Sequence, residues 1–179
     1  MGTGQMLLTV GAIVLLGTVI LTTNRRINDS SEVMLKTNFG LESTSLATSI
    51  IDEAQYLPFD DSTANSFGEA TEYIALSSTN QLTPVNLLGY DGGGDDTLPN
   101  DFDDYNGQPG GPGYRLVTLP MSTGIYKVKT SVCYVTPSNL EGTSLVRTWF
   151  KRMDVSVWNT ADSLDTVKMS AIYSYWYFR

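Results

Sequence analysis

Six aspartates lie within fourteen residues near the middle of the chain. They are Asp91, Asp95, Asp96, Asp101, Asp103 and Asp104. Calcium takes roughly six to eight oxygen ligands in proteins, so this group predicts a Ca2+ site. The spacing differs from that of an EF-hand loop, which needs D-x-[DN]-x-[DN]-G and a late glutamate. The alternative is an acidic loop exposed to water, which binds no metal and keeps the surface soluble.

The composition excludes most other site chemistry. The chain has no histidine, which removes Ser-His-Asp and Cys-His nucleophile pairs and imidazole metal sites. A single cysteine, Cys133, leaves no intramolecular disulfide and no cysteine-rich zinc site. Acid pairs such as Asp103 and Asp104 have the chemistry of a general acid and base, but no nucleophile accompanies them. We therefore expect a protein that is not an enzyme.

The charge divides the chain into three parts. Residues 1–59 carry three basic and five acidic side chains, residues 60–113 carry ten acidic and no basic ones, and residues 114–179 carry eight basic and four acidic ones. The net charge is −8, and no basic cluster is large enough to follow a phosphate backbone. We expect no nucleic-acid partner.

The N-terminal segment is long and uncharged. No charged side chain occurs before Arg25, and residues 6–21 read MLLTVGAIVLLGTVIL. As a helix, residues 1–24 would span roughly 36 Å, enough to cross a bilayer core of about 30 Å. A helix that is apolar on all sides is typical of lipid or of a core made of many helices. A cleaved secretory signal is the alternative, which the absence of a preceding basic region and of a small-x-small cleavage site disfavours.

The helical pattern continues beyond the apolar segment. No proline precedes Pro58, and apolar residues recur at spacings of 4, 7, 4 and 7, which places them on one helical face. These residues are Leu35, Phe39, Leu46, Ile50 and Leu57. The pattern predicts one helix from about residue 3 to about residue 56, apolar in its first half and amphipathic in its second. Gly40 allows a local bend. The alternative is a short membrane helix followed by a separate second helix.

The C-terminal third has the composition of a β-sheet. Four runs are rich in Val, Thr, Tyr, Trp and Ile: Tyr114–Leu119, Ile125–Val135, Leu145–Trp158 and Thr166–Phe178. The connections between them are short and rich in turn residues, which predicts a four-stranded antiparallel meander. One face of that sheet can bury the amphipathic half of the long helix. Between helix and sheet, Gly, Asp, Asn and Pro predict loops, with Glu72–Ser77 as one short strand or helical turn.

Alternation within the runs predicts which side chains face the helix. In the second run these are Tyr126, Val128, Thr130, Val132 and Tyr134; in the third, Trp149, Met153, Val155 and Val157; in the fourth, Val167, Met169, Ala171, Tyr173, Tyr175 and Tyr177. Cys133 is predicted to be a small side chain that fills space in a strand. The aromatic residues near the C-terminus are predicted to pack on the helix and sheet; an adhesive or stacking surface is the alternative.

Together these patterns predict an α+β fold with three parts. Residues 1–57 form a helical stem, in which residues 1–24 are the filament-core or membrane segment. Residues 58–113 form an acidic Gly/Asp-rich loop region, and residues 114–179 form an antiparallel β-sheet domain of about four strands.

This order of segments resembles a type IV pilin or pseudopilin. The stretch GTGQMLLTVGAIVLLGTVILTTNRR is similar to the pilin N-terminal helix in length, in composition and in ending at charged residues. DFDDYNG at 101–107, a Lys/Thr/Val-rich strand ending in Tyr-Val, and KRMDVSVWN are similar to the C-terminal half of minor pilins of the mannose-sensitive-haemagglutinin type. The resemblance covers most of the chain.

The resemblance implies an assembly role for the stem. Most pilins carry a glutamate five residues after the leader-peptide cleavage site, where it neutralises the N-terminal amine of a neighbouring subunit. With Met1 as the first residue after cleavage, Gln5 takes that position, and an amide can donate and accept hydrogen bonds but carries no charge. Gly11, Ala12 and Gly17 are small residues that allow close packing between helices.

The sequence thus predicts a structural subunit of an extracellular type IV pilus-like filament at the cell surface. The subunit would polymerise with itself through its N-terminal helices, after a membrane-inserted stage at the inner membrane with the pilus assembly machinery. One alternative is a pseudopilin of a type II secretion-like machine or a low-copy minor pilin. The other is a single-pass membrane-anchored binding module, with or without calcium, that never polymerises.

Overall fold

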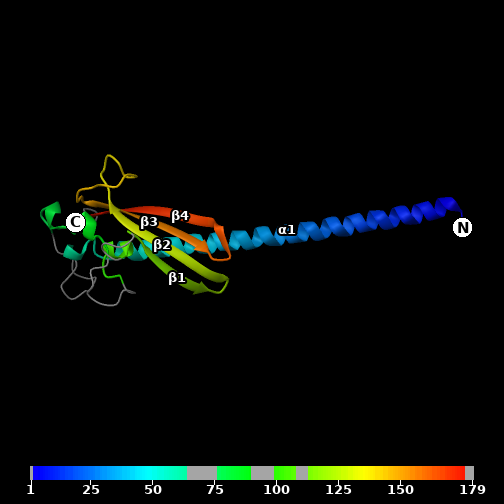
Figure 1. The fold of residues 1–179 in the computed structure, drawn as a ribbon, viewed down its shortest axis with the longest axis horizontal. Coiled ribbons are helices and arrows are strands. Elements are labelled where there is room, and N and C mark those ends of the chain that lie inside the picture. The colour runs from blue at the N-terminus through cyan, green and yellow to red at the C-terminus, as the bar shows by residue number, and fades with distance from the viewer. Residues whose placement is uncertain (1, 64–75, 90–98, 108–112, 176–179) are drawn as a thin grey trace. The chain divides into compact units, whose positions relative to one another are not determined.

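The structure, a computed structural model, describes residues 2–63, 76–89, 99–107 and 113–175. The chain divides into two compact units, Met1–Phe39 and Gly40–Arg179, each described here by itself. The boundary falls inside a helix, at the glycine where the sequence allows a bend. Figure 1 names the helices and strands used below.

One helix, α1, runs from Thr3 to Tyr56. The single helix predicted from the sequence is therefore confirmed, and the alternative of two separate helices is wrong. With no proline before Pro58, nothing in the segment removes a backbone N–H from the helical ladder. Threonine hydroxyls along the helix donate to carbonyls of the preceding turn, as from Thr22 Oγ1 to the Thr18 oxygen at 2.7 Å. Such bonds satisfy the hydroxyls where no other polar group is in reach.

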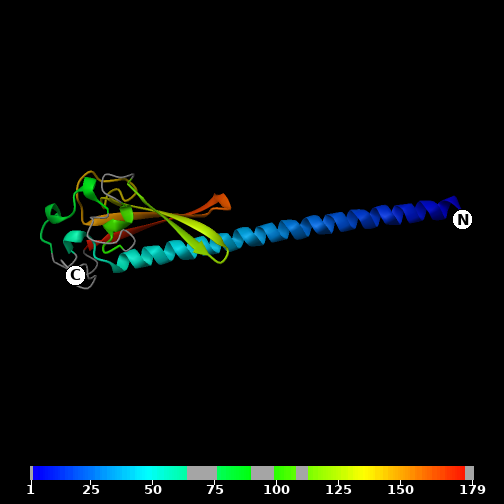
Figure 2. The same ribbon diagram turned by 60° about the horizontal axis from the view of Figure 1, so that its bottom comes forward.

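Four antiparallel strands follow in the order β1-β2-β3-β4. They are β1 (Arg115–Met121), β2 (Gly124–Tyr134), β3 (Phe150–Asn159) and β4 (Asp162–Ser174). Each strand pairs with the next one along the chain, so the predicted meander and α+β fold are confirmed. The part of α1 that belongs to the second unit lies alongside these strands in both ribbon views (Figures 1 and 2).

Two strand boundaries differ from the predicted ones. The third strand begins at Phe150 rather than Leu145, because the hydroxyl of Ser144 bonds the backbone N–H and carbonyl of Val146 and holds a local turn there. Leu145 is left 89% exposed. The fourth strand begins at Asp162 rather than Thr166, because the tight turn after Asn159 lets pairing start at once.

The second unit buries α1 through small side chains. The buried residues of the helix are Ser43, Ala47, Ile51 and Ala54. The predicted apolar face is therefore wrong in its centre: Leu35 is exposed, and Phe39, Leu46, Ile50 and Leu57 are only partly buried. Small residues at the line of closest approach let a helix backbone lie near a sheet, and the larger side chains then flank the contact.

The predicted inward face of the sheet agrees with the structure better than the predicted buried face of α1 does. All five residues predicted for β2 are buried, as are Met153, Val155 and Val157 of β3. Tyr173 is buried on β4, and Tyr175 just beyond it.

Between α1 and β1, the described residues form four short 3-10 helices: Asp61–Thr63, Thr79–Gln81, Val85–Leu87 and Asp103–Asn106. Of the predicted short element Glu72–Ser77, only Leu76 and Ser77 are described, and they lie in neither helix nor strand; residues 72–75 lie outside the described residues.

Candidate assembly surface and a buried charged cluster

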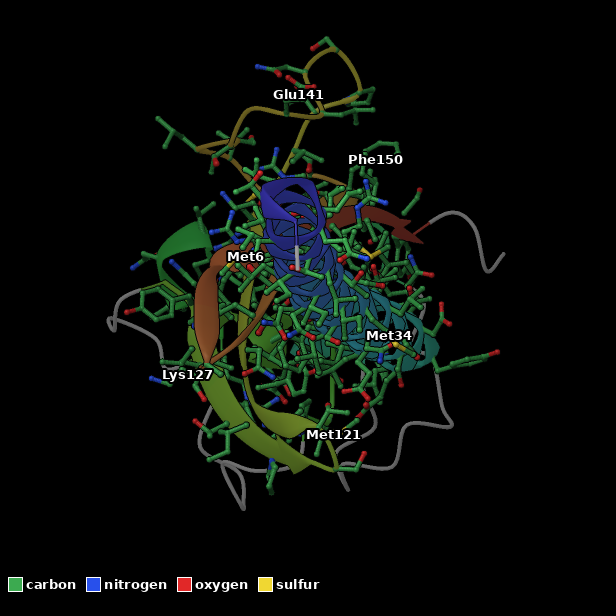
Figure 3. All side chains as sticks on the ribbon, turned by 90° about the vertical axis from the view of Figure 1, so that its right-hand side faces the viewer. Met6, Met34, Met121, Lys127, Glu141 and Phe150 are labelled. Carbon is green, nitrogen blue, oxygen red and sulfur yellow. The ribbon has the colours of Figure 1, made fainter. Side chains whose placement is uncertain are left out.

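The first unit presents an apolar helix with no buried side chain. Every residue from 2 to 38 is exposed, among them Met6 at 67% and Met34 at 67%, which Figure 3 labels. An 18-residue window of α1 has a mean hydropathy of 2.3, and none of it is buried. By length and composition this helix can cross a membrane. An apolar surface of this extent marks a site of contact with other molecules or lipid.

The residues predicted for assembly lie on this helix. Gln5, Gly11, Ala12 and Gly17 are exposed on α1, while Met1 lies outside the described residues. A Cβ at Gly11 or Gly17 would meet no atom within 4 Å, so nothing in the described chain requires glycine there. Their role in assembly stays a prediction.

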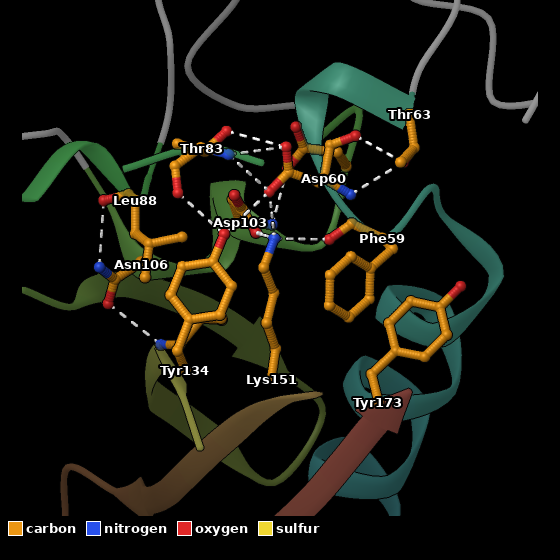
Figure 4. A network of polar contacts seen from close by, with 12 residues as sticks. Phe59, Asp60, Thr63, Thr83, Leu88, Asp103, Asn106, Tyr134, Lys151 and Tyr173 are labelled. Atoms are coloured by element: carbon orange, nitrogen blue, oxygen red, sulfur yellow. Dashed lines mark hydrogen bonds and ion pairs between the residues drawn. The ribbon is translucent and has the colours of Figure 1, made fainter. Parts of the chain in front are cut away.

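The second unit contains a buried cluster of charged side chains. The ammonium of Lys151, on β3, is completely buried and donates three hydrogen bonds (Figure 4). The acceptors are the Phe59 carbonyl at 2.7 Å, the Asp60 carboxylate at 2.7 Å and the Asp103 carboxylate. The ring of Phe59 lies 4.3 Å from the nitrogen, and the ring of Tyr134 5.1 Å. The three donor positions of the lysine are thus all used in a pocket without exposed surface.

Asp60 is fixed in its ionised form by many donors. Besides Lys151, its carboxylate accepts hydrogen bonds from the N–H and hydroxyl of Thr83, the N–H of Ser62 and the hydroxyl of Tyr134. Burial raises the pKa of Asp60, but the charge of Lys151 and these hydrogen bonds outweigh it and bring the pKa down to about 2. Burial, followed by the charge of Asp60, raises the pKa of the Tyr134 phenol.

Asp103 has the opposite environment. Its Oδ1 accepts from Lys151, and its buried Oδ2 has no hydrogen-bond partner among the described residues. Burial, the largest influence, and the nearby charge of Asp60 raise the pKa of Asp103 to about 8, against the attraction of Lys151. Burial lowers the pKa of Lys151, but the charges of Asp103, Asp60 and Asp101 more than reverse this and raise it. Near neutral pH the cluster therefore holds one ammonium, one carboxylate and one neutral acid.

The other two described aspartates of the predicted calcium group shape the adjacent turn. Asp101 Oδ1 accepts from the N–H groups of Asp103 at 2.6 Å and Asp104 at 3.2 Å, and Asp104 Oδ2 accepts from the N–H of Asn100 at 2.7 Å. Burial, followed by the charges of Asp103 and Asp104, raises the pKa of Asp101 well above its usual range. The Asp101 carboxylate therefore satisfies the first two backbone N–H groups of the short helix Asp103–Asn106, and the Asp104 carboxylate satisfies that of Asn100, before the helix.

The structure describes three of the six aspartates predicted to bind calcium. Asp101, Asp103 and Asp104 are buried, so the alternative of a water-exposed acidic loop is wrong for them. Each accepts hydrogen bonds at one of its two carboxyl oxygens, from Lys151 or from backbone N–H groups. Asp91, Asp95 and Asp96 lie outside the described residues. Among the residues that are described, no group of three acidic or sulfur ligands is arranged to hold a metal ion. Calcium binding stays a prediction.

Lys151 is the member of the buried cluster that sequence reasoning missed. It stands between Trp149 and Met153 in the alternation of β3, so the same parity that predicts an inward Met153 also predicts an inward Lys151. A lysine on a buried face needs an anionic partner in the core, and the acidic residues 60–113 are the source of one. That signal was present in the sequence.

Two smaller predictions concern the sheet itself. Cys133 is a free, half-buried thiol on β2, opposite Arg152 of β3. Tyr173 and Tyr175 make edge contacts with Phe59, at ring-centre distances of 5.5 and 5.7 Å. Packing is therefore confirmed for these two tyrosines, whereas residues 176–178 lie outside the described residues.

Comparison of the chain with protein-family models, with curated proteins and with solved structures found no significant match.

Proposed function

We propose that this protein is a structural subunit of an extracellular, type IV pilus-like filament. The observation that carries the proposal is a single helix, Thr3–Tyr56, whose apolar first part has no buried side chain and whose last part belongs to a folded α+β unit. Such a subunit is inserted in the inner membrane before assembly and polymerises by packing its helix against the helices of other copies.

The physical argument concerns where the apolar helix is stable. Outside a bilayer, the exposed side chains of residues 6–21 need another apolar environment, at about 25 cal/mol for each Å2 removed from water. A bundle of identical helices supplies that environment. Gly11, Ala12 and Gly17 leave room for the close approach that such a bundle needs. One contact repeated without closure generates an open helical filament.

The same helix also fits the second candidate, a membrane-anchored binding module that never polymerises, because it is long and apolar enough to span a bilayer. The two candidates differ in what surrounds the helix in its final state, which is protein in a filament and lipid in an anchor. A pseudopilin or low-copy minor pilin shares the first state and differs in abundance.

The test is electron microscopy of filaments sheared from cells that produce the chain, with mass spectrometry of the filament protein. We expect thin helical filaments with this chain as the main component. A filament that contains the chain only in traces would favour the low-copy subunit. Cells without filaments, with the chain retained in the membrane fraction, would overturn the proposal in favour of the anchor.

Substitution of Ala12 by aspartate provides the matched variant. A charge at this position is costly inside a helix bundle, so we expect filaments to disappear. Ser45→Asp places the same charge at an exposed position of the same helix in the second unit, and filaments should persist. Normal filaments from the Ala12→Asp chain would contradict a helical filament core.

A further inference from the structure

Lys151, Asp103 and Asp60 form an arrangement whose chemistry goes beyond a buried ion pair, and beyond the proposed function. An amine and a carboxyl group touch in a pocket with no exposed surface, and a second carboxylate contacts the same amine. We propose that Lys151 and Asp103 condense to an intramolecular isopeptide bond, with Asp60 as the proton acceptor. The bond would join β3 covalently to the short helix Asp103–Asn106.

The roles of the two carboxyl groups follow from their contacts. Asp60 is held as an anion by Thr83, Ser62 and Tyr134, so it is a poor electrophile but can take a proton from the adjacent ammonium. Asp103 has its side chain bonded to Lys151 alone among the described residues, and its buried Oδ2 has no partner. A neutral carboxylic acid fits this environment, with its O–H at Oδ2, and a neutral acid is the form that an amine attacks.

The position of the reacting atoms favours attack. Lys151 Nζ is hydrogen-bonded to Oδ1 of Asp103, which places the carboxyl carbon one bond further away. Holding two groups in contact converts a bimolecular step into a unimolecular one and removes a large part of the barrier. Because the Asp103 carboxyl has no hydrogen-bond partner other than Lys151 among the described residues, it can rotate about the Cβ–Cγ bond and present its face to the amine.

The step balances without any further reactant. Asp60 accepts one proton from the Lys151 ammonium, and the free amine attacks Cγ of Asp103, so that an Nζ–Cγ bond forms. The Cγ–Oδ2 bond then breaks, and the hydroxyl leaves with a second amine proton, shuttled through Asp60, as one water molecule. An amide and a protonated Asp60 remain, and the net charge of the cluster is zero before and after.

The surroundings also favour the product. A buried ion pair carries a desolvation cost even when it is hydrogen-bonded, whereas an amide is neutral and is left with hydrogen-bond partners that are already present. Its N–H can donate to the Phe59 carbonyl, which now accepts from Nζ. The rings of Phe59 and Tyr134 border the nitrogen and exclude the water that would hydrolyse the bond.

The test is mass spectrometry of the purified full-length chain. We expect an intact mass lower than that of the sequence by one water molecule. Because dehydration at an aspartate elsewhere gives the same change, the decisive result is a branched peptide. After trypsin, cleavage behind Lys151 should fail, and residues 37–115 should be joined to residues 148–152. Fragmentation should place the branch at Asp103.

Three variants sharpen the result. Lys151→Arg keeps the charge but should abolish the branched peptide. Asp60→Asn removes the proton acceptor and should do the same while both reacting groups remain. Asp103→Asn should still react, but with loss of ammonia in place of water. A folded wild-type chain with unmodified Lys151 and no branched peptide would overturn the proposal, and a branch at Asp60 would overturn the assigned roles.

Discussion

The first unit exposes its apolar side chains, and the second buries a cluster of charged side chains. Residues 6–21 present leucine, isoleucine and valine to the outside, whereas Lys151, Asp60 and Asp103 have almost no exposed surface. An apolar side chain in water and a charged side chain in an apolar interior are both unfavourable unless other groups cover or pair them. They differ in where compensation comes from. The cluster has its partners within the same chain, while no described residue covers the side chains of residues 2–38.

The two units differ in whether contacts within a single chain cover their side chains. Asp60 and Lys151 satisfy each other through contacts that exist in a single chain. For the helix, the described residues contain no buried side chain before Phe39 at all. A change in the cluster should therefore alter the stability of the folded unit, and a change in the apolar helix should alter insertion or assembly and leave that unit intact.

The largest effect is expected from Lys151→Ala. This substitution leaves two buried carboxyl groups without their cation, and breaking a buried pair costs about 3–5 kcal/mol of unfolding free energy. The measurement is urea unfolding of the full-length chain in detergent, followed by tryptophan fluorescence. Lys168→Ala, at an exposed position on β4, is the control and should change the free energy by less than about 0.5 kcal/mol. Equal effects would break the comparison.

The pH dependence of stability comes next, because it distinguishes the ionic cluster from the condensed one. In the ionic form, the pKa of Asp60 falls from 3.8 to about 2, so its stabilisation is complete above about pH 4 and is lost as the pH falls toward about 2. The pKa of Asp103 rises to about 8, so its contribution is complete below about pH 4 and is lost as the pH rises through about 8.

Condensation removes the charge of Lys151 and the carboxyl of Asp103 and leaves a protonated Asp60, so the loss of stability toward about pH 2 disappears. We therefore expect urea unfolding of the wild-type chain to lack that low-pH loss, while Lys151→Arg, which keeps the ionic form, shows it. A wild-type profile that matches the Lys151→Arg profile would contradict the amide.

For the helix, Ala12→Asp should act on membrane insertion. An aspartate near the centre of a spanning helix costs about 2.5–3.5 kcal/mol. We expect the variant to be recovered largely outside the bilayer when the chain is reconstituted with vesicles and sedimented. Ala12→Leu should sediment with the vesicles like the wild type. Equal recovery of all three would mean that residues 6–21 do not enter the bilayer.

The smallest effect is expected from replacing alanine by leucine at two positions of α1. Ala47 is completely buried, so Ala47→Leu should overpack the second unit and lower its unfolding free energy by about 1–3 kcal/mol. Ala12→Leu adds the same atoms at an exposed position and should change that free energy by less than about 0.5 kcal/mol. Thermal unfolding measured by circular dichroism checks both. A stabilising Ala47→Leu would mean that the contact has spare volume.

Local patterns predicted the elements of this fold because those elements depend on neighbours in sequence. Uninterrupted helical residues up to Tyr56, and alternation in β2 and β3, were sufficient for the helix and the strand order. The start of β3 was misjudged because one hydroxyl, that of Ser144, holds a turn in a segment of strand-like composition.

The buried cluster could be predicted only in part. The alternation of inward and outward side chains along β3 predicts that Lys151 points inward. Its partners, however, are residues 60 and 103, and no local sequence pattern links these to residue 151. The same limit applies to α1, where the helix face that is buried depends on how closely the sheet approaches Ala47 and Ala54. Contacts between distant segments decide both.

The meander order has a consequence for the time course of folding. Each strand pairs with its neighbour in sequence, so β1-β2, β2-β3 and β3-β4 hairpins can form early and quickly. Lys151 is different, because its partners at residues 60 and 103 must close much longer loops. We therefore expect the lysine to stay hydrated on a nascent sheet until both segments reach it, and the closure of these loops to follow the formation of the hairpins.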